Sequence, residues 1–375
     1  MNDVHKDHQN IGKILIVIRR SHGDVLLSST LVNALHSEYP AAHIDLLVND
    51  DTLATARAVP NVNAIHCFSY KWRKDGLWAC LSKEIKLIRS IFRKYDLAIS
   101  LTANERSNIY AFLAGQTSIG NEGTQREQFS WKNVLLGHTY IFDAGQHTIH
   151  NNLKPLQLLK IPTGKIKAQI QYSAEAKTKV KQILAERNIK HFLIFHASAR
   201  YQHKIYPVDL RNQLLDNLSG LGIPIIITGG PSQLDQQISS ELPVNENIYD
   251  LTNQTSIDET IALTDLSLGY IGMDTLNVHI AAALNKRIFL ISGPTPLAAW
   301  SPWSNDLQTC ATENKPLQTY GNITVFQANL DCVACGLAGC DDQDGESKCL
   351  TIISPKTIFG EIKHWLTIRP TTGTE

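Results

Sequence analysis

Short apolar runs alternate with longer amphipathic stretches along most of the chain. The apolar runs are the length of strands and rich in β-branched residues, whereas the stretches between them have the spacing of helices. This alternation predicts parallel sheets covered by helices. Strands are expected at residues 13–18, 43–48, 62–67, 96–101, 192–196, 223–228, 266–271 and 287–291. Helices are expected at 24–36, 50–59, 77–94, 172–187, 209–221, 256–264, 277–284 and 356–366.

The alternation stops at a polar stretch and then starts again, which divides the chain into two halves. A chain of 375 residues is also too long for one ordinary core. We therefore predict two Rossmann-like lobes with a cleft between them, an N-terminal lobe over residues 1–165 and a C-terminal lobe over 166–354. A last helix and tail at 355–375 could pack back on the first lobe. Ligands of open parallel sheets bind beyond the carboxyl ends of the strands, so the residues that follow strands are candidates for a site.

Composition and charge exclude several classes of protein. Hydrophobic residues make up 43% and charged residues 19%, and the net charge is zero, so nothing indicates a nucleic-acid partner. Met1–Gly12 lacks an apolar signal-peptide core, and no apolar run approaches the ~20 residues of a membrane span. A cytoplasmic location is expected, with peripheral contact at the inner membrane left open. Basic residues crowd one stretch: Lys71, Arg73, Lys74, Lys83, Lys86, Arg89, Arg93 and Lys94.

The segment Arg19–Val25 directly follows the first expected strand. Gly23 permits a tight turn into the next helix, and Asp24 sits where its carboxylate can face a ligand. A carboxylate in such a position could act as a general base that takes the proton of an attacking hydroxyl. The alternative is that Asp24 caps the helix, and spacing alone favours capping.

A second polar segment follows the first strand of the C-terminal lobe. Ser198, Arg200, His203 and Lys204 place a hydroxyl and several cations in one loop. Such a loop suits a pyrophosphate, whose leaving charge must be stabilised in the transition state. An ordinary solvated basic loop is the alternative.

A third segment lies between a strand and an alanine-rich helix. Asp274 or Thr275 could cap this helix and leave its first backbone N–H groups open to phosphate. His279 lies about one turn further along and could border the ligand, although a histidine beside apolar residues is more often structural.

Four of the seven cysteines cluster near the C-terminus. The spacing of Cys332, Cys335, Cys340 and Cys349 could hold Zn²⁺ or iron in a structural site, with free thiols as the alternative. A catalytic metal is not expected here. Asp342-Gln343-Asp344 looks like a metal-binding DxD motif, but it follows no core strand and is interpreted as chance.

These motifs, in this order, resemble glycosyltransferase family 9, the ADP-heptose lipopolysaccharide heptosyltransferases. The resemblance covers nearly the whole chain. It is carried by Ile16-Val17-Ile18-Arg19, Gly23-Asp24-Val25-Leu26, Ala34-Leu35, Tyr39-Pro40, Asp250-Leu251-Thr252, Asp274-Thr275, His279, Ala281-Ala282-Ala283-Leu284 and Ser292-Gly293-Pro294-Thr295.

The resemblance implies a GT-B fold, an inverting mechanism and no cofactor required for catalysis. It also implies ADP-heptose as the donor and lipopolysaccharide core as the acceptor. Asp24 would be the base, Lys204 and Ser198 would bind the donor phosphates, and Asp274-Thr275 with His279 would hold the nucleotide sugar. The resemblance therefore favours Asp24 as the catalytic base over Asp24 as a helix cap.

Two departures from the family pattern bear on the donor site. Leu276 stands where the family usually has Gly, and the loop before Lys204 is one residue longer, so His203 could share or replace its role.

Two other functions stay open. One is a transferase of the same fold with another nucleotide sugar or a protein acceptor, since the cysteine segment is similar to that of iron-binding, protein-modifying heptosyltransferases. The other is a non-catalytic nucleotide-sugar-binding scaffold, which Leu276 mildly favours. The sequence contains no GxGxxG after a strand, Walker A, HExxH or GxSxG motif.

Overall fold

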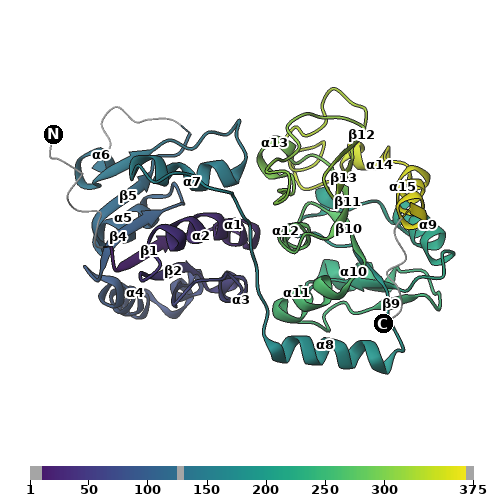
Figure 1. The fold of residues 1–375 in the computed structure, drawn as a ribbon, viewed down its shortest axis with the longest axis horizontal. Helices are drawn as coiled ribbons and strands as arrows, with labels where there is room; N and C mark the ends of the chain where they lie inside the picture. The colour runs from purple at the N-terminus through teal and green to yellow at the C-terminus, as the bar shows by residue number, and fades with distance from the viewer. Residues whose placement is uncertain (1–10, 125–130, 369–375) are drawn as a thin grey trace. The chain divides into compact units, whose positions relative to one another are not determined.

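The computed structural model describes residues 11–124 and 131–368. The chain divides into two compact units, Met1–Gln171 and Tyr172–Glu375, and each is built from a sheet with helices packed against it (Figure 1). The division falls six residues after the expected end of the first lobe at residue 165. Each unit is described by itself below.

The first unit contains a six-stranded sheet in which the paired strands are parallel, in the order β3-β2-β1-β4-β5-β6. β1 is central because Ile14–Val17 are fully buried and pair with strands on both sides. The strand order reverses between β1 and β4, and such a switch point is where Rossmann-like sheets bind ligands. The strands are β1 Lys13–Val17, β2 His43–Asn49, β3 Ala64–Phe68, β4 Tyr95–Ser100, β5 Gly115–Asn121 and β6 His138–Tyr140.

Helical segments lie at the expected ranges 50–59 and 77–94, whereas the three helices described within residues 105–158 were not expected. The single helix expected at 24–36 is two helices, separated at Ser28. The hydroxyls of Ser28 and Thr30 donate to carbonyls three residues earlier, and such bonds compete with regular helix geometry. The helical elements are α1 His22–Leu27, α2 Ser29–Glu38, η2 Asp50–Thr52, α3 Leu53–Arg57, η3 Tyr70–Asp75, α4 Leu77–Ile91, α5 Glu105–Ala114, α6 Trp131–Leu135 and α7 Thr148–Leu158.

The second unit contains a seven-stranded sheet in the order β12-β13-β11-β10-β7-β8-β9. Only the β12–β13 pair is antiparallel among these pairings. Its switch point lies between β7 and β10, the counterpart of β1 and β4 in the first unit. The strands are β7 Leu193–His196, β8 Ile225–Thr228, β9 Ile248–Asp250, β10 Gly269–Met273, β11 Arg287–Ile291, β12 Leu317–Tyr320 and β13 Ile323–Phe326.

The last helix, α15, belongs to the second unit. Ile358 and Ile362 are fully buried, and the Trp365 ring meets Phe289 of β11 edge-on at 5.6 Å. The apolar face of this helix is therefore used within its own unit. The other helical elements here are α8 Ala174–Glu186, η4 Gln202–Lys204, α9 Val208–Ser219, α10 Gln233–Ser240, α11 Ile257–Leu266, α12 Leu276–Ala283, α13 Leu297–Trp300 and α14 Lys348–Thr351, and α15 spans Pro355–Ile368.

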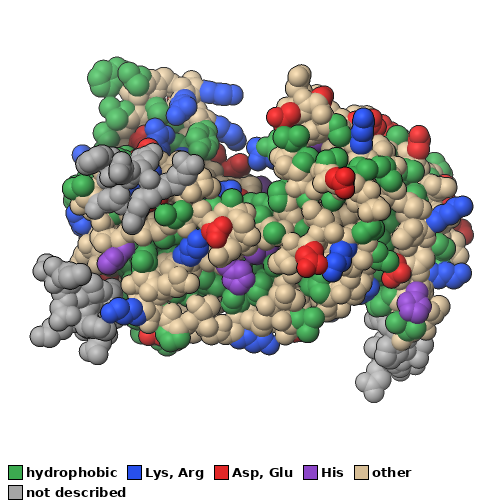
Figure 2. All heavy atoms as spheres, turned by 90° about the horizontal axis from the view of Figure 1, so that it is seen from above, with side chains coloured by type: hydrophobic (Ala, Val, Ile, Leu, Met, Phe, Trp, Pro, Cys, Tyr) green, Lys and Arg blue, Asp and Glu red, His purple; other side chains and the backbone are tan. Residues whose placement is uncertain are grey.

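Charged side chains of both signs, with hydrophobic ones among them, are spread over the face seen in Figure 2. Within residues 11–124 and 131–368, no helix is both long enough and apolar enough to span a bilayer.

Candidate functional site

The loop after β1 holds Asp24 in the first turn of α1. Asp24 is only 4% exposed, and its carboxylate accepts a hydrogen bond from the Ser21 hydroxyl at 2.5 Å and pairs with Arg20 Nε at 2.9 Å. The helix N-cap is Ser21, so the interpretation of Asp24 as the capping residue is wrong. Asp24 is thus a buried carboxylate at the switch point, held by one cation and one hydroxyl.

Arg19 joins the two strands that border this switch point. Its backbone N–H donates to Thr102 Oγ1 at 3.0 Å, directly after β4. Its guanidinium is buried and lies 3.9 Å from the centre of the Phe68 ring, with Tyr70 and Tyr110 also near, and burial lowers the pKa of Arg19. Arg19 was not among the predicted site residues, although a basic pair directly after a buried strand was a usable signal.

In the second unit, the structure brings together three residues that the sequence had selected. Lys204 Nζ lies 2.9 Å from Asp274 Oδ2, and His279 Nε2 lies 3.9 Å from Asp274 Oδ1. Lys204 follows β7 and Asp274 follows β10, so the group spans the switch point. The Lys204 side chain is 26% exposed.

The N-terminus of α12 lies beside this group. Thr275 is the N-cap, and its hydroxyl accepts a hydrogen bond from the Asn277 backbone N–H at 3.3 Å, which settles the capping residue as Thr275 rather than Asp274. The first turn of a helix presents free N–H groups and a partial positive charge, which suits a phosphate.

His196 connects α12 to the strands. Its Nε2 lies 2.9 Å from the Asn277 amide nitrogen, and its Nδ1 lies 3.0 Å from Thr228 Oγ1. Burial lowers the pKa of His196 to about 4, so the ring is neutral at neutral pH. A neutral ring can accept from the Asn277 amide and donate to Thr228, which fixes the carboxyl ends of β7 and β8 relative to α12.

Ser198 lies after β7 as expected, but its hydroxyl is used inside the protein. It donates to Asp235, whose carboxylate also accepts from the Gly230 N–H at 2.8 Å and from Ser232. Burial would raise the pKa of Asp235, and these hydrogen bonds together lower it. Since a hydroxyl has one proton, Ser198 must rotate away from Asp235 before it can donate to a phosphate.

Asp235 was not among the predicted site residues, although the sequence contained a signal for it. Ser232 and Asp235 form a capping box at the start of α10, and the Ser-x-x-Asp spacing follows Gly229-Gly230 at the end of a strand.

The two remaining basic candidates of this loop have different surroundings. His203 is buried and its Nδ1 donates to Asp344 at 2.5 Å, so Lys204 and not His203 faces Asp274. Arg200 is exposed, with its guanidinium carbon 5.5 Å from the centre of the Tyr201 ring.

The four clustered cysteines differ in exposure. Cys349 is buried, whereas Cys332, Cys335 and Cys340 are exposed. Burial, with the neighbouring Cys340 and Cys335, raises the pKa of the Cys349 thiol to about 11. In the part of the chain that the structure describes, no three His, Cys, Asp or Glu side chains are placed to hold a metal ion. The donor atoms suit Zn²⁺ or iron, so a structural metal stays a prediction, which metal analysis of the purified protein tests.

Comparison with known proteins identifies the family. The sequence pattern of glycosyltransferase family 9 (heptosyltransferase) matches residues 84–327, more than half of the chain. The chain belongs to glycosyltransferase family 9. It is therefore a glycosyltransferase of the heptosyltransferase family, as the motifs at Asp24 and Asp274 predicted.

Similar proteins agree with this family. Lipopolysaccharide heptosyltransferase 3 of Escherichia coli (strain K12) is 27% identical over 77% of this chain and 84% of its own. The solved structure of a family 9 glycosyl transferase from Veillonella parvula has a TM-score of 0.75 and 16% identity, covering 96% of this chain and 98% of its own. That of E. coli ADP-heptose lps heptosyltransferase II has a TM-score of 0.70 and 18% identity, covering 95% and 98%. These structures confirm the predicted GT-B fold class.

Proposed function

We propose that this family 9 enzyme transfers heptose from ADP-heptose to a lipopolysaccharide core acceptor at the cytoplasmic face of the inner membrane. The observation that carries the proposal is the group formed by Lys204, Asp274 and His279 beside the N-terminus of α12. The relatives named for ADP-heptose and lipopolysaccharide support this choice of donor and acceptor.

The second unit would bind the donor. Lys204 and the N-terminus of α12 would neutralise the charge that develops on the departing ADP. Asp274 orients Lys204 through their 2.9 Å ion pair, while His279 and Thr275 border the same place. Arg200 is exposed on the same loop and would add a second cation.

The first unit would supply the base. Asp24 would take the proton of the acceptor hydroxyl as its oxygen bonds to the anomeric carbon. The bond from that carbon to the phosphate oxygen breaks at the same time, and ADP leaves with the electron pair. One displacement of this kind inverts the anomeric configuration. Arg20, 2.9 Å from Asp24, would hold the carboxylate in position for the acceptor hydroxyl.

A thermal-shift panel with ADP, UDP, GDP and CMP at equal concentration tests the donor. A ligand that binds only the folded state stabilises it by about 2.7 kcal/mol at 100 times its Kd. We expect a selective shift with ADP. A preference for another nucleotide would contradict ADP-heptose as the donor, and no shift with any of the four would contradict nucleotide binding by this enzyme.

A transfer assay with ADP-heptose and purified core acceptors tests the reaction. We expect a product whose anomeric configuration is opposite to that of the donor. A product that keeps the donor configuration would contradict the single displacement by way of Asp24. Transfer to protein acceptors alone would agree with the proposed reaction but contradict lipopolysaccharide core as the acceptor.

A further inference from the structure

The outer side of α4 is apolar and exposed. Leu77 and Trp78 are 80% and 81% exposed, and Leu81 and Ile85 are also exposed large hydrophobic residues. Leu77, Leu81 and Ile85 are spaced by four residues, so they lie along one side of the helix with Trp78 beside them. We call these four residues the α4 stripe. A contiguous apolar surface of this kind indicates an interaction site rather than scattered exposure.

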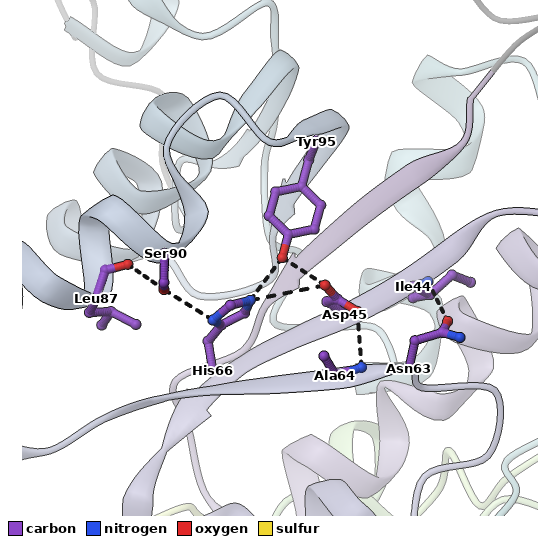
Figure 3. A network of polar contacts seen from close by, with 8 residues as sticks. All are labelled: Ile44, Asp45, Asn63, Ala64, His66, Leu87, Ser90 and Tyr95. Atoms are coloured by element: carbon purple, nitrogen blue, oxygen red, sulfur yellow. Dashed lines mark hydrogen bonds and ion pairs between the residues drawn. The ribbon is translucent and has the colours of Figure 1, made fainter.

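A neighbouring side of α4 is attached to the sheet. Leu87 and Ile91 are buried, and the Ser90 hydroxyl lies 3.2 Å from His66 Nδ1 (Figure 3). The network continues from His66 Nε2 to the Tyr95 hydroxyl at 2.8 Å, and Tyr95 donates to Asp45 at 2.7 Å (Figure 3). Burial lowers the pKa of His66, which keeps the ring neutral at neutral pH. Because the inner side is held in this way, the α4 stripe is a fixed outer surface.

The surroundings of the α4 stripe are strongly basic. Residues 70–94 contain eight lysines and arginines but two acidic residues, in a chain whose net charge is zero. Both acids are paired, Asp75 with Lys83 at 2.7 Å and Glu84 with the Tyr110 hydroxyl at 2.8 Å. The basic residues are all exposed: Lys71, Arg73, Lys74, Lys83, Lys86, Arg89, Arg93 and Lys94.

We propose that the α4 stripe and its basic surroundings dock this enzyme on an anionic lipid bilayer. A helix with Trp, Leu and Ile on one side and Lys and Arg next to them lies in the membrane interface, where the apolar side enters the acyl boundary. The basic side chains are attracted to anionic headgroups. A second copy of the chain fits less well, because two such faces would bring like charges together.

The inference deepens the proposed function, because a lipopolysaccharide acceptor would be presented at a membrane. Its test does not use the reaction. Full-length protein is floated with vesicles of phosphatidylcholine alone or with about one-third phosphatidylglycerol. We expect binding to the anionic vesicles that weakens with added salt, because exposed charges are screened. Failure of binding with retained heptose transfer would leave the proposed function standing.

Two variants separate the apolar and the basic contributions. We expect Trp78→Ser/Leu81→Ser to lose most binding to anionic vesicles. Lys86→Gln/Arg89→Gln should weaken it by roughly fivefold for each charge removed. The matched controls are Val244→Ser and Lys181→Gln, which change an exposed apolar and an exposed basic residue of the second unit.

Three outcomes would overturn the inference. The first is that the parent protein binds neither kind of vesicle. The second is that the Trp78→Ser/Leu81→Ser variant binds anionic vesicles as well as the parent does. The third is that the parent forms a concentration-dependent dimer but binds no vesicles, and that this variant abolishes the dimer. Because the four substituted side chains are exposed, both variants should keep the thermal unfolding midpoint of the parent. An unchanged midpoint would show that a loss of vesicle binding is not caused by unfolding.

Discussion

Asp344 accepts two hydrogen bonds from His203, one from Nδ1 at 2.5 Å and one from the backbone N–H at 3.2 Å. Asp344 lies in the cysteine-rich segment, and His203 directly precedes Lys204. The Ser347 hydroxyl adds a further bond to the His203 carbonyl at 2.7 Å. The cysteine-rich segment therefore holds the loop that carries Lys204, the cation proposed to bind the donor phosphates.

Asp344→Ala should weaken ADP binding without removing any group that touches ADP. Loss of the charge-assisted bonds frees the loop around Lys204, and about 1.4 kcal/mol of lost interaction corresponds to about a tenfold higher Kd. Isothermal titration calorimetry measures the change. Glu346→Ala is the matched control, because Glu346 is an exposed acid of the same segment. Equal affinity of both variants and the parent would show that the segment does not position Lys204.

Lys204→Met should raise the Kd for ADP by about 10- to 100-fold. A charge-assisted hydrogen bond contributes about 1.5–3 kcal/mol, and the variant also leaves the Asp274 carboxylate without its cation near the phosphates. Lys315→Met, which breaks the exposed pair with Glu313, should leave ADP binding unchanged.

A double variant sharpens this prediction. Lys204→Met/Asp274→Asn should bind ADP no worse than Lys204→Met, because the repulsive carboxylate is neutralised with its partner. If the loss of ADP-binding free energy in the double variant equalled the sum of the losses in the two single variants, Lys204 and Asp274 would act on the ligand separately.

The alternation of apolar runs predicted the two Rossmann-like sheets because buried parallel strands must be apolar on both faces. The residues after β1, β7 and β10 could be selected for the same reason, since ligands bind at those strand ends. Helix 24–36 was predicted as continuous because the local hydroxyl bonds at Ser28 do not change the apolar spacing.

The partners of the selected residues could not be predicted in this way. The His203–Asp344 bond joins positions 141 apart in the chain, and Asp344 lies in a segment whose carboxylates were interpreted as chance. The capping box could have indicated Asp235, but its contact with Ser198 joins the start of α10 to the loop after β7 and could not be predicted from spacing. Such pairings follow from tertiary packing, which spacing along the chain does not record.

Asp24→Asn should lower kcat for heptose transfer by about 10²- to 10⁴-fold, the usual contribution of a general base. ADP affinity should stay within about twofold, because the proposed donor-binding residues lie in the second unit. Single-turnover kinetics and calorimetry measure the two quantities. Asp51→Asn, at an exposed acid of the first unit, is the control. A parallel loss of ADP binding and turnover would assign Asp24 a structural role instead.

The stability of the second unit should fall as the pH falls below about 6.5, because of His196. Burial lowers the pKa of His196 in the folded state to about 4, so the unfolded chain takes up the proton first. The neutral ring therefore contributes fully above about pH 6.5, and its contribution is lost as the pH falls toward about 4. Between about pH 7.5 and about pH 5 this linkage amounts to about 2 kcal/mol.

Denaturant unfolding at both pH values measures this loss, with fluorescence and circular dichroism used to separate the two units. His196→Gln should be less stable at pH 7 because the Thr228 and Asn277 bonds are altered, but it should lose about 2 kcal/mol less on acidification. His191→Gln, at an exposed histidine of the same unit, should leave the pH dependence unchanged. If His196→Gln showed the same pH dependence as the parent, another group would have to take up the proton on unfolding.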